Sequence, residues 1–143
     1  FIYTLFLALD ANFCLKHKDV SSEKKDTGLG NGWAFFCEVK VYIAHVKKHW
    51  DFKQDICNFP SHCVAHDAVD KPDHEAQGTA SLGVGIIDCA RHNMKRPRAV
   101  GDLQLGEQYI NMDYMFFASI AGSPLMWYSV LYNITCQWHI NIW

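Results

Sequence analysis

Two short polar residues each follow an apolar run, and these runs lie near opposite ends of the sequence. Asp10 follows the run 1–9 and Asn133 follows the run 125–132, both rich in aromatic and branched residues. Such runs predict buried strands, and α/β proteins gather ligands at the carboxyl ends of strands. Carboxylate oxygens there suit Mg²⁺, which can activate water for phosphoryl transfer. The alternative is that Asp10 only caps a turn.

Two Cys-x-x-His pairs form a second group of residues that could do chemistry. Cys63 and His66 make the first pair, Cys89 and His92 make the second, and 22 residues lie between them. Two such pairs, each holding one side of an ion, suit a tetrahedral zinc site that would also organise the irregular stretch 55–78. The alternative is a set of buried thiols and surface histidines. Further candidate ligands are Cys57, His62 and His74.

The densest basic cluster of the chain lies between residues 91 and 98. The formal net charge is -2, whereas a protein that holds DNA by many phosphate contacts usually carries a positive excess. DNA binding therefore needs a local patch, and this cluster is the best candidate for phosphate contacts. A solvated charged loop is the alternative. The basic residues are Arg91, Lys95, Arg96 and Arg98, with His92 and Pro97 among them.

These residues need a scaffold, and the apolar pattern predicts one. Alternate residues from Cys37 to Ile43 are apolar, which favours a strand over 35–44. Apolar residues of 103–121 recur at helical spacing and predict a helix. Further expected elements are a solvated loop at 20–32, a helical turn or two at 45–52, a strand at 81–88, a basic loop at 94–100 and a helix from Cys136.

Composition indicates one globular domain over 1–143, since half of the residues are apolar and 14% are aromatic. The run 1–9 is shorter than the roughly 20 residues of a membrane span, and it lacks the basic start and cleavage site of a signal peptide. We therefore expect an intracellular protein without membrane association. The chain begins at Phe1 and ends in an apolar segment at Trp143, so we expect a domain truncated at both ends. It has no Walker loop, nucleophile elbow or kinase signature.

Several blocks of the sequence together resemble the catalytic region of Kyakuja–Dileera–Zisupton (KDZ) transposases, which are abundant in mushroom-forming fungi. The resemblance runs in the same order along nearly the whole chain, and the long stretch 88–114 is the most specific part. The blocks are LALDANF (7–13), GLGNGWAFF (28–36), DCARHNMKRP (88–97), VGDLQLGEQY (100–109), NMDY (111–114) and CQWH (136–139).

The resemblance implies an RNase H-like fold of the α/β (α+β) class, a mixed sheet flanked by helices, with an irregular zinc-organised insertion at about 20–78. It also implies a DDE-type triad of acids that holds Mg²⁺ or Mn²⁺ and cuts DNA. The first acid falls on Asp10. The second lies in a Tyr-Asp-Ile-Ala-Cys-Gln block, which here has Asn133 in place of the aspartate. The third, a glutamate, would lie beyond Trp143.

The same resemblance implies nuclear location, transposon ends and target DNA as partners, and possible oligomerisation. Both Cys-x-x-His pairs fall in family-like blocks, which favours structural Zn²⁺. Asn133 can offer an oxygen but no charge, so we expect weak Mg²⁺ binding and no catalysis by this fragment. Two other interpretations stay open. One is a non-catalytic, zinc-stabilised DNA- or protein-binding remnant of a transposable element, and the other is transposon debris without a selected function.

Overall fold

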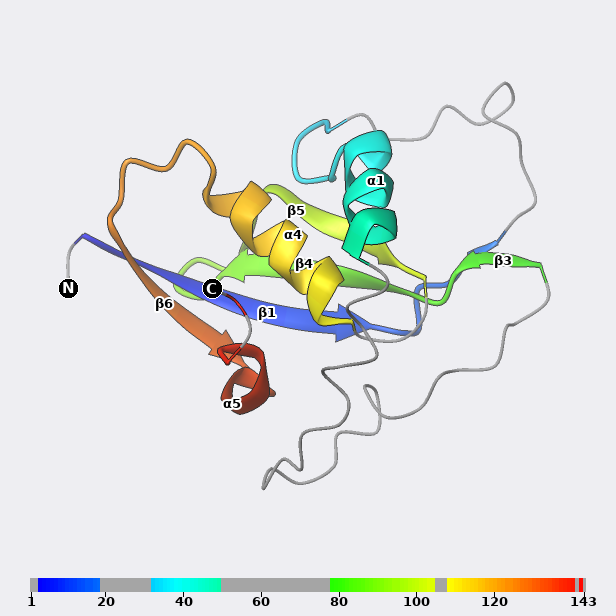
Figure 1. Ribbon diagram of the computed structural model, residues 1–143. Coiled ribbons are helices and arrows are strands. Elements are labelled where there is room, and N and C mark those ends of the chain that lie inside the picture. Colours follow the sequence, from blue (N-terminus) through cyan, green and yellow to red (C-terminus); the bar gives the residue numbers. More distant parts are fainter. Residues whose placement is uncertain (1–2, 19–31, 50–77, 105–107, 141, 143) are drawn as a thin grey trace.

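The central element of the computed structural model is a four-stranded mixed sheet in the order β5-β4-β1-β6 (Figure 1). β1 pairs antiparallel with β4, β4 pairs antiparallel with β5, and β6 runs parallel to β1. The structure describes residues 3–18, 32–49, 78–104, 108–140 and 142. The four strands are β1 (Thr4–Asn12), β4 (Gly83–Cys89), β5 (Met94–Leu103) and β6 (Trp127–Tyr132).

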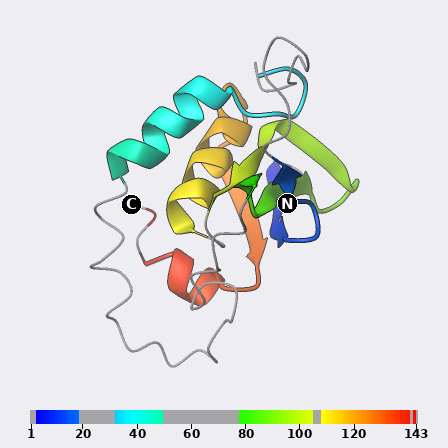
Figure 2. The ribbon, with the colours of Figure 1, turned by 90° about the vertical axis from the view of Figure 1, so that its right-hand side faces the viewer.

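The described helices all lie on one side of this sheet, as the turned view shows (Figure 2). They are α1 (Val39–His49), α4 (Tyr109–Ile120) and α5 (Thr135–Trp138). Because α4 crosses the sheet between β5 and β6, the chain can return with β6 parallel to β1. Two short strands, β2 (His17–Lys18) and β3 (Thr79–Ser81), pair antiparallel in a separate small sheet.

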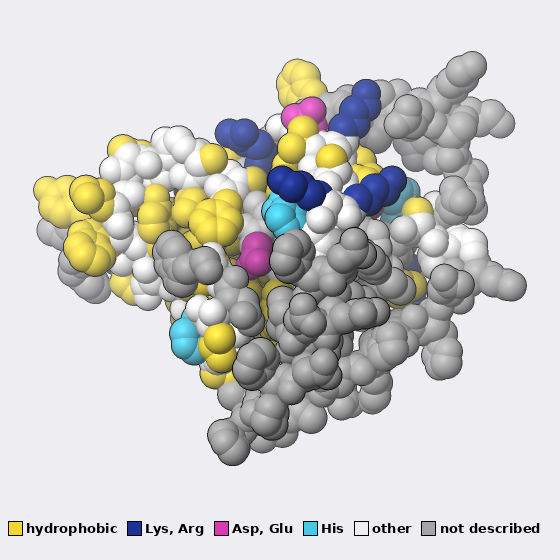
Figure 3. Space-filling view, viewed as in Figure 1, with side chains coloured by type: hydrophobic (Ala, Val, Ile, Leu, Met, Phe, Trp, Pro, Cys, Tyr) yellow, Lys and Arg dark blue, Asp and Glu magenta, His cyan; other side chains and the backbone are white. Residues whose placement is uncertain are grey.

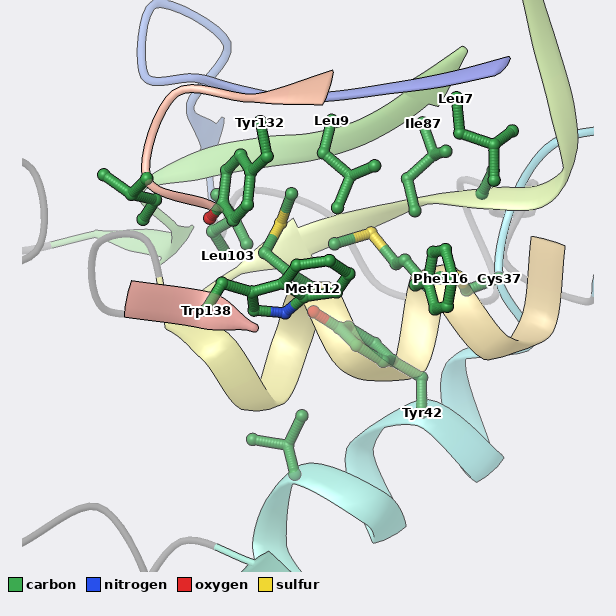
Figure 4. Close-up of a cluster of buried hydrophobic side chains, with 14 residues drawn as sticks. Leu7, Leu9, Cys37, Tyr42, Ile87, Leu103, Met112, Phe116, Tyr132 and Trp138 are labelled. Atoms are coloured by element: carbon green, nitrogen blue, oxygen red, sulfur yellow. The ribbon is translucent and has the colours of Figure 1, made fainter. Parts of the chain in front are cut away.

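The hydrophobic core lies between the sheet and α4 (Figure 4). Leu7 and Leu9 of β1 and Ile87 of β4 point into it and are 0 to 4% exposed, because alternate residues of a strand face the same side. Met112 and Met115 of α4 fill the space opposite them and are fully buried. The core therefore fixes which face of β1 turns toward the helices.

A buried polar network joins α1 to α4 and β5. The Tyr42 hydroxyl donates to the carbonyl of Asp102 at 2.7 Å, and the side-chain amide of Asn111 donates to the Tyr42 oxygen. The same amide donates to Gln104 Oε1 at 2.9 Å. Tyr42 is only 2% exposed, so α1 is anchored by one aromatic ring whose polar end is satisfied inside the protein.

The strand predicted over 35–44 is wrong. Residues from Val39 onward form α1, and the apolar residues that suggested alternation are largely outside: Val39 is 42% exposed and Val41 is 50% exposed. The helix instead buries Tyr42 and Val46, which are four residues apart and share one helix face. Packing of that face against α4 overrides the local preference of branched residues for strands.

The basic loop predicted over 94–100 is also wrong, because this stretch belongs to β5. Pro97 suggested a loop, but β5 is an edge strand, where a missing N–H donor is tolerated. The register against β4 shifts between Ile86 and Asp88, and Arg98 has a positive φ of 53°. The strand accommodates the proline through this irregularity.

The mixed α/β class is confirmed, and the strands predicted over 1–9, 81–88 and 125–132 correspond to β1, β4 and β6. β1 continues to Asn12, so Asp10 lies inside the strand rather than after it. The helix predicted over 103–121 begins only at Tyr109, because Leu103 pairs within the sheet as part of β5. The predicted helix at Cys136 is α5, and the stretches 20–32 and 55–78 lie almost entirely outside the described residues.

Candidate functional site

Asp10 and Asn133 line one open hollow of about 630 Å³ at the carboxyl ends of β1 and β6. The parallel register pairs Leu9 with Tyr132, so the two polar residues follow directly after the same paired position. The structure therefore brings together the two polar residues that the sequence singled out, although Asp10 lies inside β1. The hollow is lined by Ala8, Leu9, Asp10, Val130, Leu131, Tyr132, Asn133 and Thr135.

The backbone around the hollow is held firmly while its polar side chains are exposed. Tyr132 is buried, and its ring makes an edge contact with Trp138 of α5 at a centroid distance of 5.7 Å. The Thr135 hydroxyl donates to the Tyr132 carbonyl at 2.6 Å, which fixes the turn that carries Asn133. On the other strand, Asp10 Oδ1 accepts the N–H of Ala11 at 2.9 Å. Both side chains are exposed and can meet a ligand from solvent.

Among the described residues that line this hollow, Asp10 is the only carboxylate. Asn133 offers an amide oxygen without charge. Asp113 on α4 is a different case, since its Oδ1 accepts the indole N–H of Trp138 at 2.7 Å. Burial raises the pKa of Asp113 to about 6, although the bond from Trp138 opposes that rise. Asp113 therefore belongs to the contact between α4 and α5 rather than to the hollow.

The predicted basic cluster is divided between different surroundings. Arg91 places its guanidinium 4.2 Å above the ring of Phe6, and Lys95 forms an ion pair with Asp88 at 2.7 Å. Arg96 turns to the helix side, where its Nη2 donates to the carbonyl of Ser119 on α4 at 3.3 Å. The four basic residues do not form one continuous patch.

The remaining residue of this cluster, Arg98, lies beside the segment that leads into α1. Its N–H donates to the Ala34 carbonyl at 3.4 Å, and its own carbonyl accepts the Cys37 thiol at 3.1 Å. Burial raises the pKa of Cys37 to about 12, although the charge of Arg98 opposes that rise. Cys37 is therefore a buried neutral thiol near neutral pH.

The β4–β5 hairpin that carries Arg91 lies at the opposite end of β1 from the hollow. Leu7 pairs with Cys89, just before the hairpin turn, whereas Asn12 pairs with Val84 at the other end of the same ladder. Arg91 thus lies away from Asp10 along the strand, and Lys95, which pairs with Asp88 opposite Ala8, lies between them. Sequence reasoning missed this separation, because it depends on the pairing of segments that are far apart in the chain.

One of the two predicted zinc half-sites lies in this hairpin. Cys89 Sγ and His92 Nδ1 are 3.2 Å apart, so the two side chains of the pair point toward each other. Cys63 and His66 lie outside the described residues, as do Cys57, His62 and His74. In the part of the chain that the structure describes, no group of three potential metal ligands occurs. Cys14 and Cys89 are free thiols, and Cys136 is disulfide-bonded.

The fold and the hollow define a mixed α/β domain whose exposed polar residues meet at the carboxyl ends of two parallel strands. The chain belongs to the Kyakuja-Dileera-Zisupton transposase family, whose profile matches residues 3–143. No curated protein and no solved structure matches the chain significantly. Among the described helices, none is long and apolar enough to cross a membrane.

Proposed function

We propose that this chain is the core of a DDE-type DNA transposase, RNase H-like in fold, and that its catalytic site is incomplete. One observation carries the proposal: in a member of a transposase family, Asp10 and Asn133 line the same hollow on two neighbouring parallel strands. The family's first two acidic positions fall on these two residues. The partners would be transposon ends and target DNA, and the protein would act in the nucleus.

The strand connections support an RNase H-like core. Three strands, β1, β4 and β5, form an antiparallel succession, and α4 then carries the chain across one face to β6. β6 adds next to β1 and parallel to it, which makes the sheet mixed. This arrangement places the ends of β1 and β6 side by side, as a site shared by two acids requires.

The residues of the hollow do not suit a pair of divalent cations. Mg²⁺ prefers charged oxygen ligands and gives up its water reluctantly, and the described lining of the hollow offers a single carboxylate, Asp10. Asn133 supplies no charge to balance a second ion. We therefore propose no cleavage step for this chain, and we infer that an aspartate at position 133 is needed before a cation binds firmly.

Calorimetric titration with Mn²⁺ tests this proposal directly. The wild-type chain should bind Mn²⁺ weakly, and Asn133→Asp should tighten binding by about tenfold or more, because a second charged oxygen then faces the ion. Asp10→Asn should abolish the binding. Glu38→Gln removes an exposed carboxylate before α1, away from the hollow, and should change nothing.

Nicking of supercoiled DNA gives the second readout of the same proposal. The wild-type chain should show no cleavage that depends on Mg²⁺ or Mn²⁺. Asn133→Asp, combined with the downstream segment that carries the family's glutamate, should restore some cleavage. Cleavage by the wild-type chain that disappears in Asp10→Asn would contradict an incomplete site, and tight Mn²⁺ binding unaffected by Asp10→Asn would place the ion elsewhere.

A second candidate function is a zinc-stabilised DNA- or protein-binding domain without catalysis. The 3.2 Å contact between Cys89 Sγ and His92 Nδ1 favours it, because both candidate ligands of one half-site lie together in the same hairpin. Cys63 and His66 would complete the tetrahedral set. This structural role is compatible with a transposase origin, and it would persist in a copy that has lost an acid.

A further inference from the structure

The sheet has a second face that no described element covers. Along β4, the residues turned toward the helices are buried, including Ile87 at 0% exposure, whereas Val84, Ile86 and Asp88 between them are half-buried. The described helices lie on the first face only (Figure 2). We call this second face the open face. Because Asp10 alternates with the buried Leu9, Asp10 belongs to the open face.

Aromatic side chains occupy one end of the open face. Trp127 pairs with Thr4 in the parallel register and is 69% exposed. Phe6 lies two residues further along β1 on the same face, and the guanidinium of Arg91 lies 4.2 Å over its ring. A planar cation stacked on an aromatic ring and a neighbouring exposed indole offer two flat surfaces for stacking.

This end of the molecule is apolar beyond the open face as well. Figure 3, seen from the helix side, shows hydrophobic side chains gathered where β1 and β6 begin. Tyr3 and Met126 precede Thr4 and Trp127, and they are 74% and 85% exposed. The exposed apolar surface thus surrounds the start of the same two strands that end at the hollow.

The open face continues from the aromatic end to the hollow. Asp88 lies opposite Ala8, so the Lys95–Asp88 ion pair lies between Phe6 and Asp10. Residues 4 to 10 of one strand span about 20 Å. Along this path the side chains are first aromatic, then cationic, then acidic. Leu131 lies beside the path and is 51% exposed.

We propose that the open face binds a single strand of DNA through its unpaired bases, with the strand running from Trp127 toward the hollow. This proposal rests on the proposed function, since it takes DNA as the ligand of a transposase core. The path carries two cations, Arg91 and Lys95, and two carboxylates, Asp88 and Asp10, so its charges balance. Phosphate contacts are therefore few, and stacking must supply most of the affinity. A duplex keeps its bases stacked on each other and offers no free base faces to Trp127.

Fluorescence anisotropy with labelled DNA tests the proposal. The full chain is titrated, without added divalent cation, against an oligothymidylate of about 12 nucleotides and against a duplex of the same length. We expect the single strand to bind about tenfold more tightly than the duplex. Quenching of tryptophan fluorescence by the single strand should accompany the binding.

Trp127→Ala should weaken binding of the single strand by about tenfold, because one stacked base loses its platform. Trp33→Ala is the matched control, since Trp33 is 72% exposed and lies outside the four-stranded sheet. It should change the affinity less than twofold. Circular dichroism confirms that both variants are folded.

The salt dependence gives an independent measure. Two phosphate contacts predict a slope of about -1.4 for the logarithm of the binding constant against that of salt concentration, and Arg91→Ala should reduce this by about 0.7. Equal affinity for duplex, an equal loss in Trp33→Ala, or no binding of single strand by the folded chain at low salt would overturn the proposal. The proposed function is tested separately, because its Mn²⁺ titration depends on Asp10 and Asn133 without DNA.

Discussion

At the scale of single residues, an exchange of one oxygen for one nitrogen decides what the hollow can hold. Asparagine keeps the size of aspartate but loses its charge. With asparagine at position 133, Asp10 is the one carboxylate among the described residues that line the hollow. The anchors around it, Tyr132 and the turn fixed by Thr135, are intact. Under the proposed function, the hollow has the geometry of a two-acid site with only one charge, and Asn133→Asp should strengthen cation binding.

Asp113 should make the stability of the protein depend on pH. Burial raises its pKa from the usual 3.8 of an aspartate to about 6, although the hydrogen bond from Trp138 opposes this rise. Between pH 4 and 6 the folded protein thus binds more protons than the unfolded chain, so the free energy of unfolding falls as pH rises through this window. Asp113→Asn removes the ionisation, and its stability relative to wild type should increase by about 2 kcal/mol from pH 4 to pH 7. Urea denaturation at several pH values measures this.

Asparagine at position 113 retains an oxygen that can accept the indole N–H of Trp138, so the contact between α4 and α5 stays satisfied in the variant. A stability difference between Asp113→Asn and wild type that stays constant from pH 4 to 7 would contradict the assigned shift.

At the scale of elements, the attachment of α1 depends on the hydroxyl of Tyr42. That hydroxyl donates to the Asp102 carbonyl and accepts from Asn111. Tyr42→Phe keeps the ring but leaves these buried groups short of partners, which should cost about 1–3 kcal/mol of unfolding free energy. Chemical denaturation measures the loss, and hydrogen exchange should show α1 opening more readily than in wild type.

Tyr3→Phe is the matched control for this prediction. It removes the same hydroxyl from a residue that is 74% exposed, where water replaces any lost hydrogen bond. Its unfolding free energy should stay within about 0.5 kcal/mol of wild type. Equal stability of Tyr42→Phe and Tyr3→Phe would show that the network contributes nothing net.

The elements also show where sequence patterns suffice and where they do not. The apolar runs that became β1 and β6 were predictable, because each is bounded by polar residues and has the length of a strand. α1 was not, since Val39, Val41 and Ile43 imitate strand alternation while the helix faces Tyr42 toward α4. The packing of Tyr42 against α4 is a tertiary contact that favours the helix, and the periodicity of the sequence gives no information about such contacts.

The candidate site also has one part that the sequence could predict and one part that it could not. The meeting of Asp10 and Asn133 followed from two strand ends, a local signal at each position. The stacking of Arg91 on Phe6 depends on the register between β1 and β4, and a shift by one residue would put Phe6 on the helix side. The sequence therefore identified Arg91 as part of a basic cluster but could not predict its contact with the ring of Phe6.

At the scale of the whole molecule, two chemically different ends share one sheet. The hollow lies where β1 and β6 end, and the hairpin with Cys89, His92 and Arg91 lies toward the start of β1. A substitution in the hollow can therefore leave the hairpin end unchanged. A zinc ion held at the hairpin would stabilise the whole chain, because ligands distant in sequence would be tied together.

Zinc removal should therefore destabilise the entire molecule. Purified protein should contain about one zinc per chain by elemental analysis, and a chelator should lower the melting temperature by about 5 °C or more. Cys89→Ala should lose the metal and show the lower melting temperature without a chelator, because the thiol beside His92 is gone. Cys14→Ala removes a free, exposed thiol and should keep both zinc and stability. A metal-free protein that melts at the same temperature with and without chelator would exclude the zinc site, and loss of zinc in Cys14→Ala as well would show nonspecific thiol binding.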